Sequence, residues 1–115
     1  MVGAVDRGRE SFERQAWGDA WSQLSAADHD APLELEDLER LAVAAFLVGR
    51  DEESVDVWAR AHHLCIRLGD AVRAARCAFW SAFVLLNKGQ LARGGGWIHR
   101  AQRLLDENER DCVEQ

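Results

Sequence analysis

The stretch Ala20-Trp-Ser-Gln-Leu24-Ser-Ala-Ala27 sets the pattern from which the fold is predicted. It places a small residue first, a bulky apolar residue four positions on, and an alanine three positions after that. The same order returns 34 residues later and again 40 residues after that, as Ser54-x3-Trp58-x2-Ala61 and Gly94-x3-Ile98-x2-Ala101. Residues at this spacing share one face of a helix. Recurrence at such a period is typical of stacked helical hairpins, each of which buries its apolar face against its neighbour.

Apolar spacing and helix-breaking residues predict six helices in this chain of 115 residues. Pro32 separates the second from the third, because proline disfavours the helical conformation at the residue before it. Gly49, Gly69 and Gly89 follow the third, fourth and fifth helices, where glycine commonly ends a helix. The sequence shows no strand-like alternation of apolar and polar residues. The expected fold class is all-α, with helices at about 4–15, 17–28, 35–48, 52–68, 71–88 and 91–107.

The connections between these helices are short, so consecutive helices are expected to pack antiparallel as hairpins. At 115 residues the chain is expected to form a single domain. The hairpins give three repeats, at approximately 1–32, 33–69 and 70–108, and residues 109–115 begin a further helix or form a tail.

The order of residues in these hairpins resembles the tetratricopeptide repeat. That repeat places Trp-x2-Leu-Gly-x2-Tyr in its first helix, Ala-x3-Phe in its second and a proline at its end. Here the second repeat carries Leu38-x2-Leu41-Ala42-x2-Ala45, the third carries Ala78-x2-Ser81-Ala82-x2-Leu85, and Pro32 closes the first. The resemblance implies a short tetratricopeptide-like solenoid of about six helices. It also implies a repeat core formed by Ala20, Leu24, Ala27, Leu41, Ala42, Ser54, Trp58, Ala61, Ala82, Gly94, Ile98 and Ala101.

Three runs, at 41–54, 74–80 and 95–101, look like those of actinobacterial LuxR-type transcription regulators. In that family such repeats precede a C-terminal helix-turn-helix, and no helix-turn-helix can be recognised in these residues. The segment Asp111-Cys-Val-Glu-Gln resembles the start of a further repeat. The resemblance implies a non-catalytic module that binds protein or peptide, the sensory or scaffolding part of such a regulator. The chain is then either a fragment of one or a short relative without the DNA-reading domain.

In the tetratricopeptide fold, the first helix of each hairpin lines the groove where partners dock. This correspondence assigns a partner-binding groove to Arg9, Phe12, Glu39, Val43, Phe46, Arg76, Phe79, Phe83 and Asn87. All four phenylalanines of the chain belong to that set. Such a groove suits an apolar segment that carries a polar or carboxylate group. Alternatively, further repeats or a second copy of the chain cover these phenylalanines as ordinary core.

Charge is distributed unevenly around the net value of −6. Residues 1–53 hold 13 acidic residues against 5 arginines, whereas residues 54–105 hold 8 basic residues against 2 acidic ones. The two signs could pair between hairpins or between chains, or could lie on solvated faces. We expect no direct contact with nucleic acid, because no aromatic residues alternate with the arginines.

His62, His63 and Cys65 form the best metal-like cluster, but a zinc site needs three or four ligands, so neither metal nor cofactor is expected. A small-molecule or metal sensor that uses the phenylalanine-lined groove or His62 and Cys65 stays open as an alternative. Gly94-Gly95-Gly96 indicates either close helix packing or a hinge. Acidic residues cluster at two helix starts, where they complement the helix dipole: Glu34, Glu36, Asp37, Asp51, Glu52 and Glu53.

No Gly-x-Ser-x-Gly turn or paired carboxylates indicate catalysis, so the chain is not expected to be an enzyme. No apolar run approaches the roughly 20 residues of a membrane span. The start, residues 1–9, carries no secretory signal pattern, and three cysteines without Cys-x2-Cys spacing fit a reducing cytoplasm. Ile98, Leu104 and Leu105 on the last helix make a homodimer possible. A stand-alone, self-associating adaptor is therefore a further alternative.

Overall fold

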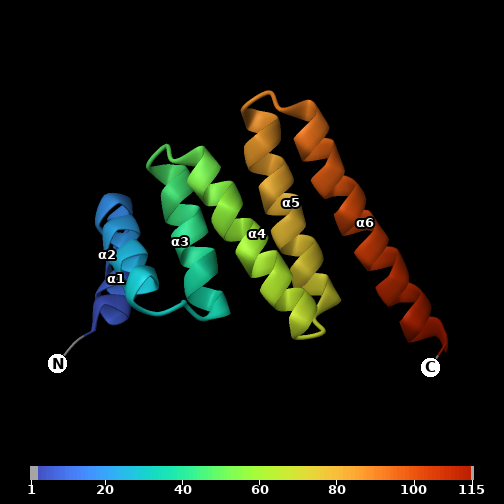
Figure 1. Cartoon of the computed structure of the whole chain (residues 1–115), viewed down its shortest axis with the longest axis horizontal. Coiled ribbons are helices and arrows are strands. Elements are labelled where there is room, and N and C mark those ends of the chain that lie inside the picture. The colour runs from blue at the N-terminus through green and yellow to red at the C-terminus, as the bar shows by residue number, and fades with distance from the viewer. Residues whose placement is uncertain (1–2, 115) are drawn as a thin grey trace. The chain divides into compact units, whose positions relative to one another are not determined.

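The computed structural model describes residues 3–114, and the side chains of residues 3–110. This part of the chain is all-helical and contains no strand, which confirms the predicted fold class. Figure 1 shows the six helices, α1 (Ala4–Glu13), α2 (Trp17–Asp30), α3 (Leu35–Leu47), α4 (Asp51–Arg67), α5 (Ala71–Asn87) and α6 (Leu91–Glu114).

Glycine ends three of these helices, as the sequence predicts. Gly49 after α3 has φ +85°, in the left-handed region that glycine adopts without steric cost. This turn lets the Arg50 N–H donate to the carbonyl of Ala45 over 2.8 Å, so the last turn of α3 keeps its hydrogen bonds. The turns at Gly69 and Gly89 repeat this geometry, with φ +76° and +78°.

Two helices run farther than predicted. α2 continues to Asp30, and the extended conformation of Ala31, immediately before Pro32, ends it. α6 continues to Glu114 without a break near residue 108, because residues 97–114 contain neither glycine nor proline. The segment predicted as a tail or a further helix is thus, as far as Glu114, the end of α6. The helix also passes through Gly94-Gly95-Gly96 without interruption.

The chain divides into two compact units, which we call the N-unit (Met1–Val57) and the C-unit (Trp58–Gln115). The boundary falls inside α4, so its first two turns belong to the N-unit and the remainder to the C-unit.

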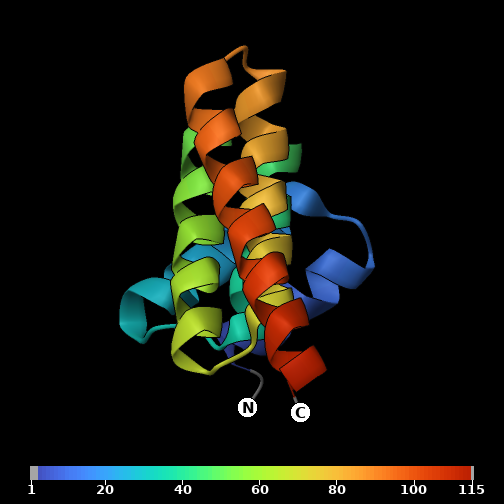
Figure 2. The ribbon, with the colours of Figure 1, turned by 90° about the vertical axis from the view of Figure 1, so that its right-hand side faces the viewer.

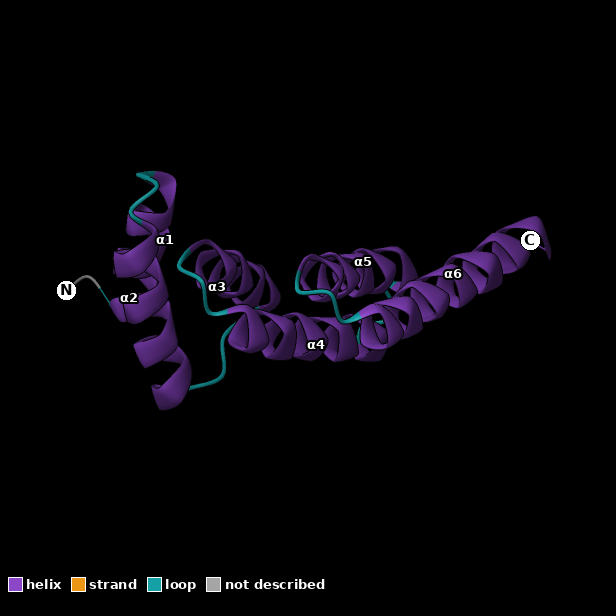
Figure 3. Ribbon diagram, turned by 90° about the horizontal axis from the view of Figure 1, so that it is seen from above, coloured by secondary structure: helices purple, strands orange, loops and turns teal. Residues whose placement is uncertain are grey.

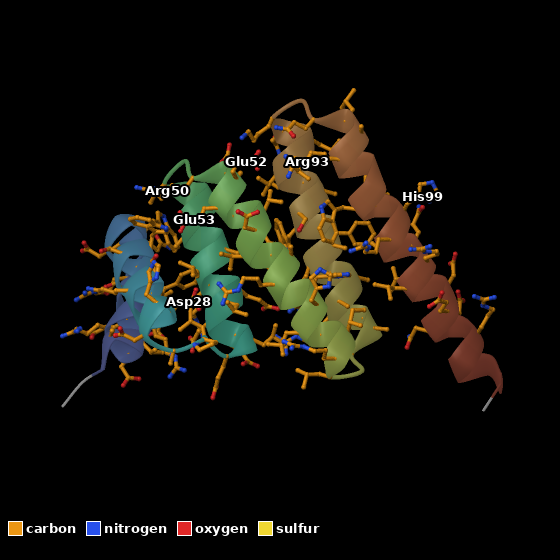
Figure 4. The ribbon with its side chains drawn as sticks, viewed as in Figure 1. Asp28, Arg50, Glu52, Glu53, Arg93 and His99 are labelled. Carbon is orange, nitrogen blue, oxygen red and sulfur yellow. The ribbon has the colours of Figure 1, made fainter. Side chains whose placement is uncertain are left out.

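In the N-unit, α1 packs closely along α2 and α3. A Cβ atom built on Gly8 of α1 would lie 2.6 Å from the Cγ of Leu24 on α2, so only glycine fits there without movement. The hydroxyl of Ser54 donates to the carbonyl of Ala42 over 2.7 Å and ties the start of α4 to α3. Arg50 lies 3.9 Å above the ring centroid of Trp21 and 3.9 Å from the carboxylate of Glu53 (Figure 4).

In the C-unit, α6 packs along α5, and Figure 2 shows it running in front of α4 and α5. Ala75 and Ala78 of α5 and Ala101 of α6 form a small buried cluster, against which Trp97, Leu104 and Leu105 pack. Gly94 permits this approach, since a Cβ atom there would lie 2.8 Å from the Cγ of Leu86. Gly94 is therefore a site of close helix packing.

Most of the residues assigned to the repeat core are buried. Ile98 is only partly buried, whereas the other eleven are buried: Ala20, Leu24, Ala27, Leu41, Ala42, Ser54, Trp58, Ala61, Ala82, Gly94 and Ala101. Burial at these positions is expected for any well-packed helical hairpin. It therefore does not distinguish a tetratricopeptide-like stack from another arrangement of hairpins.

Candidate functional site

An exposed apolar face runs along α5. Its opposite side carries small residues, among them Ala74, Ala78 and Ala82, that are buried in the C-unit. Figure 3 shows α5 on the side of the C-unit away from α4 and α6. The exposed fractions of Phe79, Trp80 and Phe83 are 44%, 43% and 47%. We call Val72, Phe79, Trp80, Phe83 and Leu86 the α5 face.

Contacts with neighbouring aromatic side chains hold two rings of this face, Trp80 and Phe83, in place. Trp80 stacks on Trp58 with ring centroids 5.9 Å apart and planes inclined by 14°. Phe83 meets Trp80 edge-on at 5.6 Å. Because Trp58 is only 4% exposed, the stack anchors an exposed ring to the buried core. A surface fixed in this way loses little side-chain entropy when a partner binds.

The charged residues on α5 itself are all basic. Asp70 precedes α5, and its carboxylate accepts a hydrogen bond from the Arg73 N–H over 3.1 Å, so it acts as the N-cap. Arg76 is exposed on α5. Residues 71–105 contain no Asp or Glu and carry six basic residues, Arg73, Arg76, Lys88, Arg93, Arg100 and Arg103. Taken by itself, this segment therefore carries a net positive charge.

Four predicted groove residues lie on α5, and all four are exposed: Arg76, Phe79, Phe83 and Asn87. The Nδ2 group of Asn87 donates to the carbonyl of Phe83 over 2.7 Å, so one of its donors is used within the helix. The other five predicted groove residues belong to the N-unit and are partly buried: Arg9, Phe12, Glu39, Val43 and Phe46. Among these, Phe12 packs edge-on against Trp17 at 5.1 Å.

Arg9, which the sequence predicts as a groove residue, forms an ion pair within the N-unit. Its Nε and Nη2 atoms donate to the two carboxylate oxygens of Asp37 over 2.9 and 2.7 Å. Arg40 donates to the same carboxylate over 2.9 Å. The guanidinium of Arg9 is thereby engaged inside the N-unit, and it holds the pKa of Asp37 below its ordinary value.

The sequence predicts that Asp37 complements the dipole at the start of α3, but in the structure it is the buried partner of Arg9 and Arg40. The side chain is 2% exposed, far less than expected of a group that only complements a helix dipole. A signal was present in the sequence, since Asp37 lies four positions before Leu41 on the apolar stripe of α3. A carboxylate on a buried stripe requires a cation, but the pattern does not say which one.

The metal-like cluster is used for packing. The Nδ1 atom of His62 lies 2.8 Å from the carbonyl oxygen of Ala74, and burial lowers the pKa of the imidazole. Cys65 is fully buried, whereas His63 is exposed. His99 projects outward from α6 (Figure 4). Within the described residues, no three histidine, cysteine or carboxylate side chains converge as a metal site would require.

In the described part of the chain, no helix combines the length and the apolar character needed to cross a membrane. No protein-family model matches the sequence, and a search of curated proteins finds no relative of this chain.

Proposed function

We propose that this chain is a non-catalytic module that binds protein or peptide, and that the α5 face receives an acidic amphipathic helix. The observation that carries the proposal is an anchored, exposed aromatic face in a segment of 35 residues, 71–105, that has six basic residues and no acidic one. Exposed apolar patches with a charged surround are typical of interaction sites.

The proposed partner helix lies along α5 and buries its apolar stripe against Phe79 and Phe83. Fully burying an exposed phenylalanine side chain contributes roughly 1.5–3 kcal/mol, and Phe79 and Phe83, at 44% and 47% exposed, would each contribute about half of that. Acidic side chains on the flanks of the partner would meet Arg76 and the neighbouring basic residues. This arrangement is the helix-in-groove mode of recognition, in which residues three and four apart serve as anchors.

The wider setting is part of the same proposal. The glycine-terminated hairpins and the close approaches at Gly8 and Gly94 support a tetratricopeptide-like stack of repeats. The runs at 41–54, 74–80 and 95–101 resemble LuxR-type regulators and support a sensory or scaffolding role in such a protein. In that setting, residues outside this chain would read the DNA.

The test uses two synthetic 20-residue helices with the same leucine stripe, one with glutamate and one with lysine at the remaining positions. We expect the glutamate peptide to bind the full chain and the lysine peptide to bind at least about tenfold more weakly.

The double variant Phe79→Ser/Phe83→Ser should lower the affinity for the glutamate peptide by about tenfold or more, since it removes the aromatic surface. Leu91→Ser, at the start of α6, is the control, since it removes an apolar side chain that is 71% exposed but lies outside the α5 face, and it should leave binding unchanged. Fluorescence anisotropy measures each affinity.

Light scattering on the unmodified chain tests the alternative that the chain associates with itself. The opposite charges of residues 1–53 and 54–105 would favour pairing of two copies. If the chain is a dimer that Phe79→Ser/Phe83→Ser dissociates, a second copy occupies the α5 face and the adaptor alternative replaces our proposal. Equal binding of the two peptides, or binding that the double variant does not weaken, also overturns it.

A further inference from the structure

A second candidate site lies in the C-unit between α4 and α6. An open pocket of about 270 Å³ is formed there by residues of both helices, on elements other than α5. Its walls are His62, His63 and Ile66 from α4, and Arg100, Arg103, Leu104 and Glu107 from α6. The volume lies just below the roughly 300–1,000 Å³ of pockets that take drug-sized ligands, so a smaller molecule fits it.

The pocket is rich in available positive charge. Arg100 and Arg103 lie on consecutive turns of α6, and His63 faces them from α4. Among the side chains that the structure describes, neither arginine is paired with a carboxylate. Arg100 rests over the ring of Trp97, 5.1 Å from its centroid, which limits its movement. Glu107 is the one acidic residue in the lining.

A neighbouring depression extends the basic surface along the same helix. It has a volume of about 330 Å³ and is lined by Arg93, Gly96, Trp97 and Arg100. Arg100 therefore lines both the pocket and the depression, and its N–H groups can donate into either. Arginine presents its donors in a planar fork that matches the two oxygens of a carboxylate.

The pocket also has apolar walls. Ile66 is 44% exposed, and Leu104 is only partly buried where it packs on the core of the C-unit. A simple inorganic anion would use the arginines and leave this apolar surface in water. A molecule with an anionic group and a short apolar body would cover both.

We propose that this pocket binds a small organic carboxylate with an aromatic or short aliphatic body. The carboxylate lies between Arg100 and Arg103, and the body rests on Ile66 and Leu104. The surroundings of His62 agree with this charge preference. Burial is the main cause that lowers the pKa of His62, and the nearby His63 and Arg100 lower it further, as expected where the local potential is positive.

The first test uses benzoate, its uncharged counterpart benzamide, and inorganic phosphate as probes of the full chain. We follow the side-chain NMR signals of His63 and Trp97, which border the pocket and the neighbouring depression. Benzoate should shift them saturably in the millimolar range. Benzamide and phosphate should each bind at least about tenfold more weakly, because benzamide lacks the charge and phosphate lacks the apolar body.

Substitutions then locate the site. Arg100→Gln and Arg103→Gln should each weaken benzoate binding about tenfold, the effect of one hydrogen bond to a charged group. Arg67→Gln, at the exposed end of α4 and outside the pocket lining, is the matched control and should have no effect. Circular dichroism checks that all three variants stay folded. Equal affinities for benzoate and phosphate, an equal effect of Arg67→Gln, or no saturable shift would each overturn the proposal.

Discussion

The N-unit and the C-unit each bury a titratable side chain, but they satisfy it in opposite ways. The N-unit buries Asp37 as a charged carboxylate and surrounds it with the guanidinium groups of Arg9 and Arg40. The C-unit buries His62, with its pKa lowered, against the carbonyl of Ala74. A buried charge needs partners, whereas a neutral ring needs only a hydrogen bond.

This difference decides which charges are left for binding. In the N-unit, two of the five arginines are bound to Asp37. In the C-unit, Arg100 and Arg103 have no carboxylate partner within the described residues, and the exposed rings of α5 lie among basic residues. We infer that the N-unit uses Arg9 and Arg40 chiefly for stability, whereas Arg100 and Arg103 of the C-unit can serve a ligand.

The largest effect is expected from Asp37→Asn. The substitution keeps the shape of the side chain but turns an acceptor oxygen into an N–H donor that faces the guanidinium of Arg9. Breaking a buried ion pair costs several kcal/mol, and the partly exposed Arg9 and Arg40 can regain some hydration. We therefore expect a loss of about 2–3 kcal/mol in the free energy of unfolding, measured in urea.

Asp6→Asn is the matched control for that measurement. Asp6 lies 3.5 Å from the same guanidinium, but its side chain is 62% exposed. Exposed ion pairs contribute little, so its loss should fall within experimental error. Equal losses from the two variants would show that burial of Asp37 is not what makes its ion pairs important.

Sequence reasoning succeeded where structure is determined locally. Gly49, Gly69 and Gly89 mark helix ends because one residue with positive φ is enough to stop a helix. The close approach at Gly94 was also predicted, since its place in the repeat pattern requires a small residue. These features depend on a few neighbouring residues.

The features that sequence reasoning missed depend on residues far apart in the chain. Asp37 binds Arg9 across 28 positions, and no periodicity predicts that pairing. The pocket between α4 and α6 needs Ile66 and Arg100 to converge, which requires the packing of two helices. The α5 face was only half predicted, because the predicted groove includes Phe79 and Phe83 but not Trp80, which is 43% exposed.

The two units also differ in how tightly a helix packs at a glycine, Gly8 in the N-unit and Gly94 in the C-unit. We expect Gly8→Ala in the N-unit to cost about 1–2 kcal/mol, because the new Cβ atom would lie 2.6 Å from Leu24, which is fully buried and cannot move aside. Gly94→Ala in the C-unit should cost less than about 1 kcal/mol. Its neighbour Leu86 is 38% exposed and can turn away, and alanine gains about 1 kcal/mol in helix propensity.

Gly95→Ala is the control for helix propensity alone. Nothing lies within 4 Å of a Cβ atom built on Gly95, so this variant should be stabilised by up to about 1 kcal/mol. Thermal unfolding of the three variants measures the order. A Gly94→Ala variant less stable than Gly8→Ala would contradict our inference that Leu86 yields more easily than Leu24.

The response to acid is the comparison that most directly separates the units. The pKa of His62 is lowered from its ordinary 6.5 in the folded state, so the unfolded state binds more protons as the pH falls. The stability that this histidine confers is therefore complete above pH 6.5 and is lost below it, at up to about 1.4 kcal/mol per pH unit. The pKa of Asp37 is lowered from 3.8, so its contribution persists until the pH falls below that value. On acidification, the contribution of His62 in the C-unit should decline first.

Urea unfolding at several pH values between 4.5 and 7.5 measures this loss, a range of roughly two units below and one above the ordinary pKa of histidine. His62→Gln should abolish the dependence of stability on pH that arises from the C-unit, because glutamine can donate to the carbonyl of Ala74 but does not titrate. His63→Gln, which alters the exposed neighbour, should retain most of it. If His62→Gln keeps the full slope, the acid sensitivity lies elsewhere, and the contrast between a charged buried group and a neutral one does not explain how the two units differ.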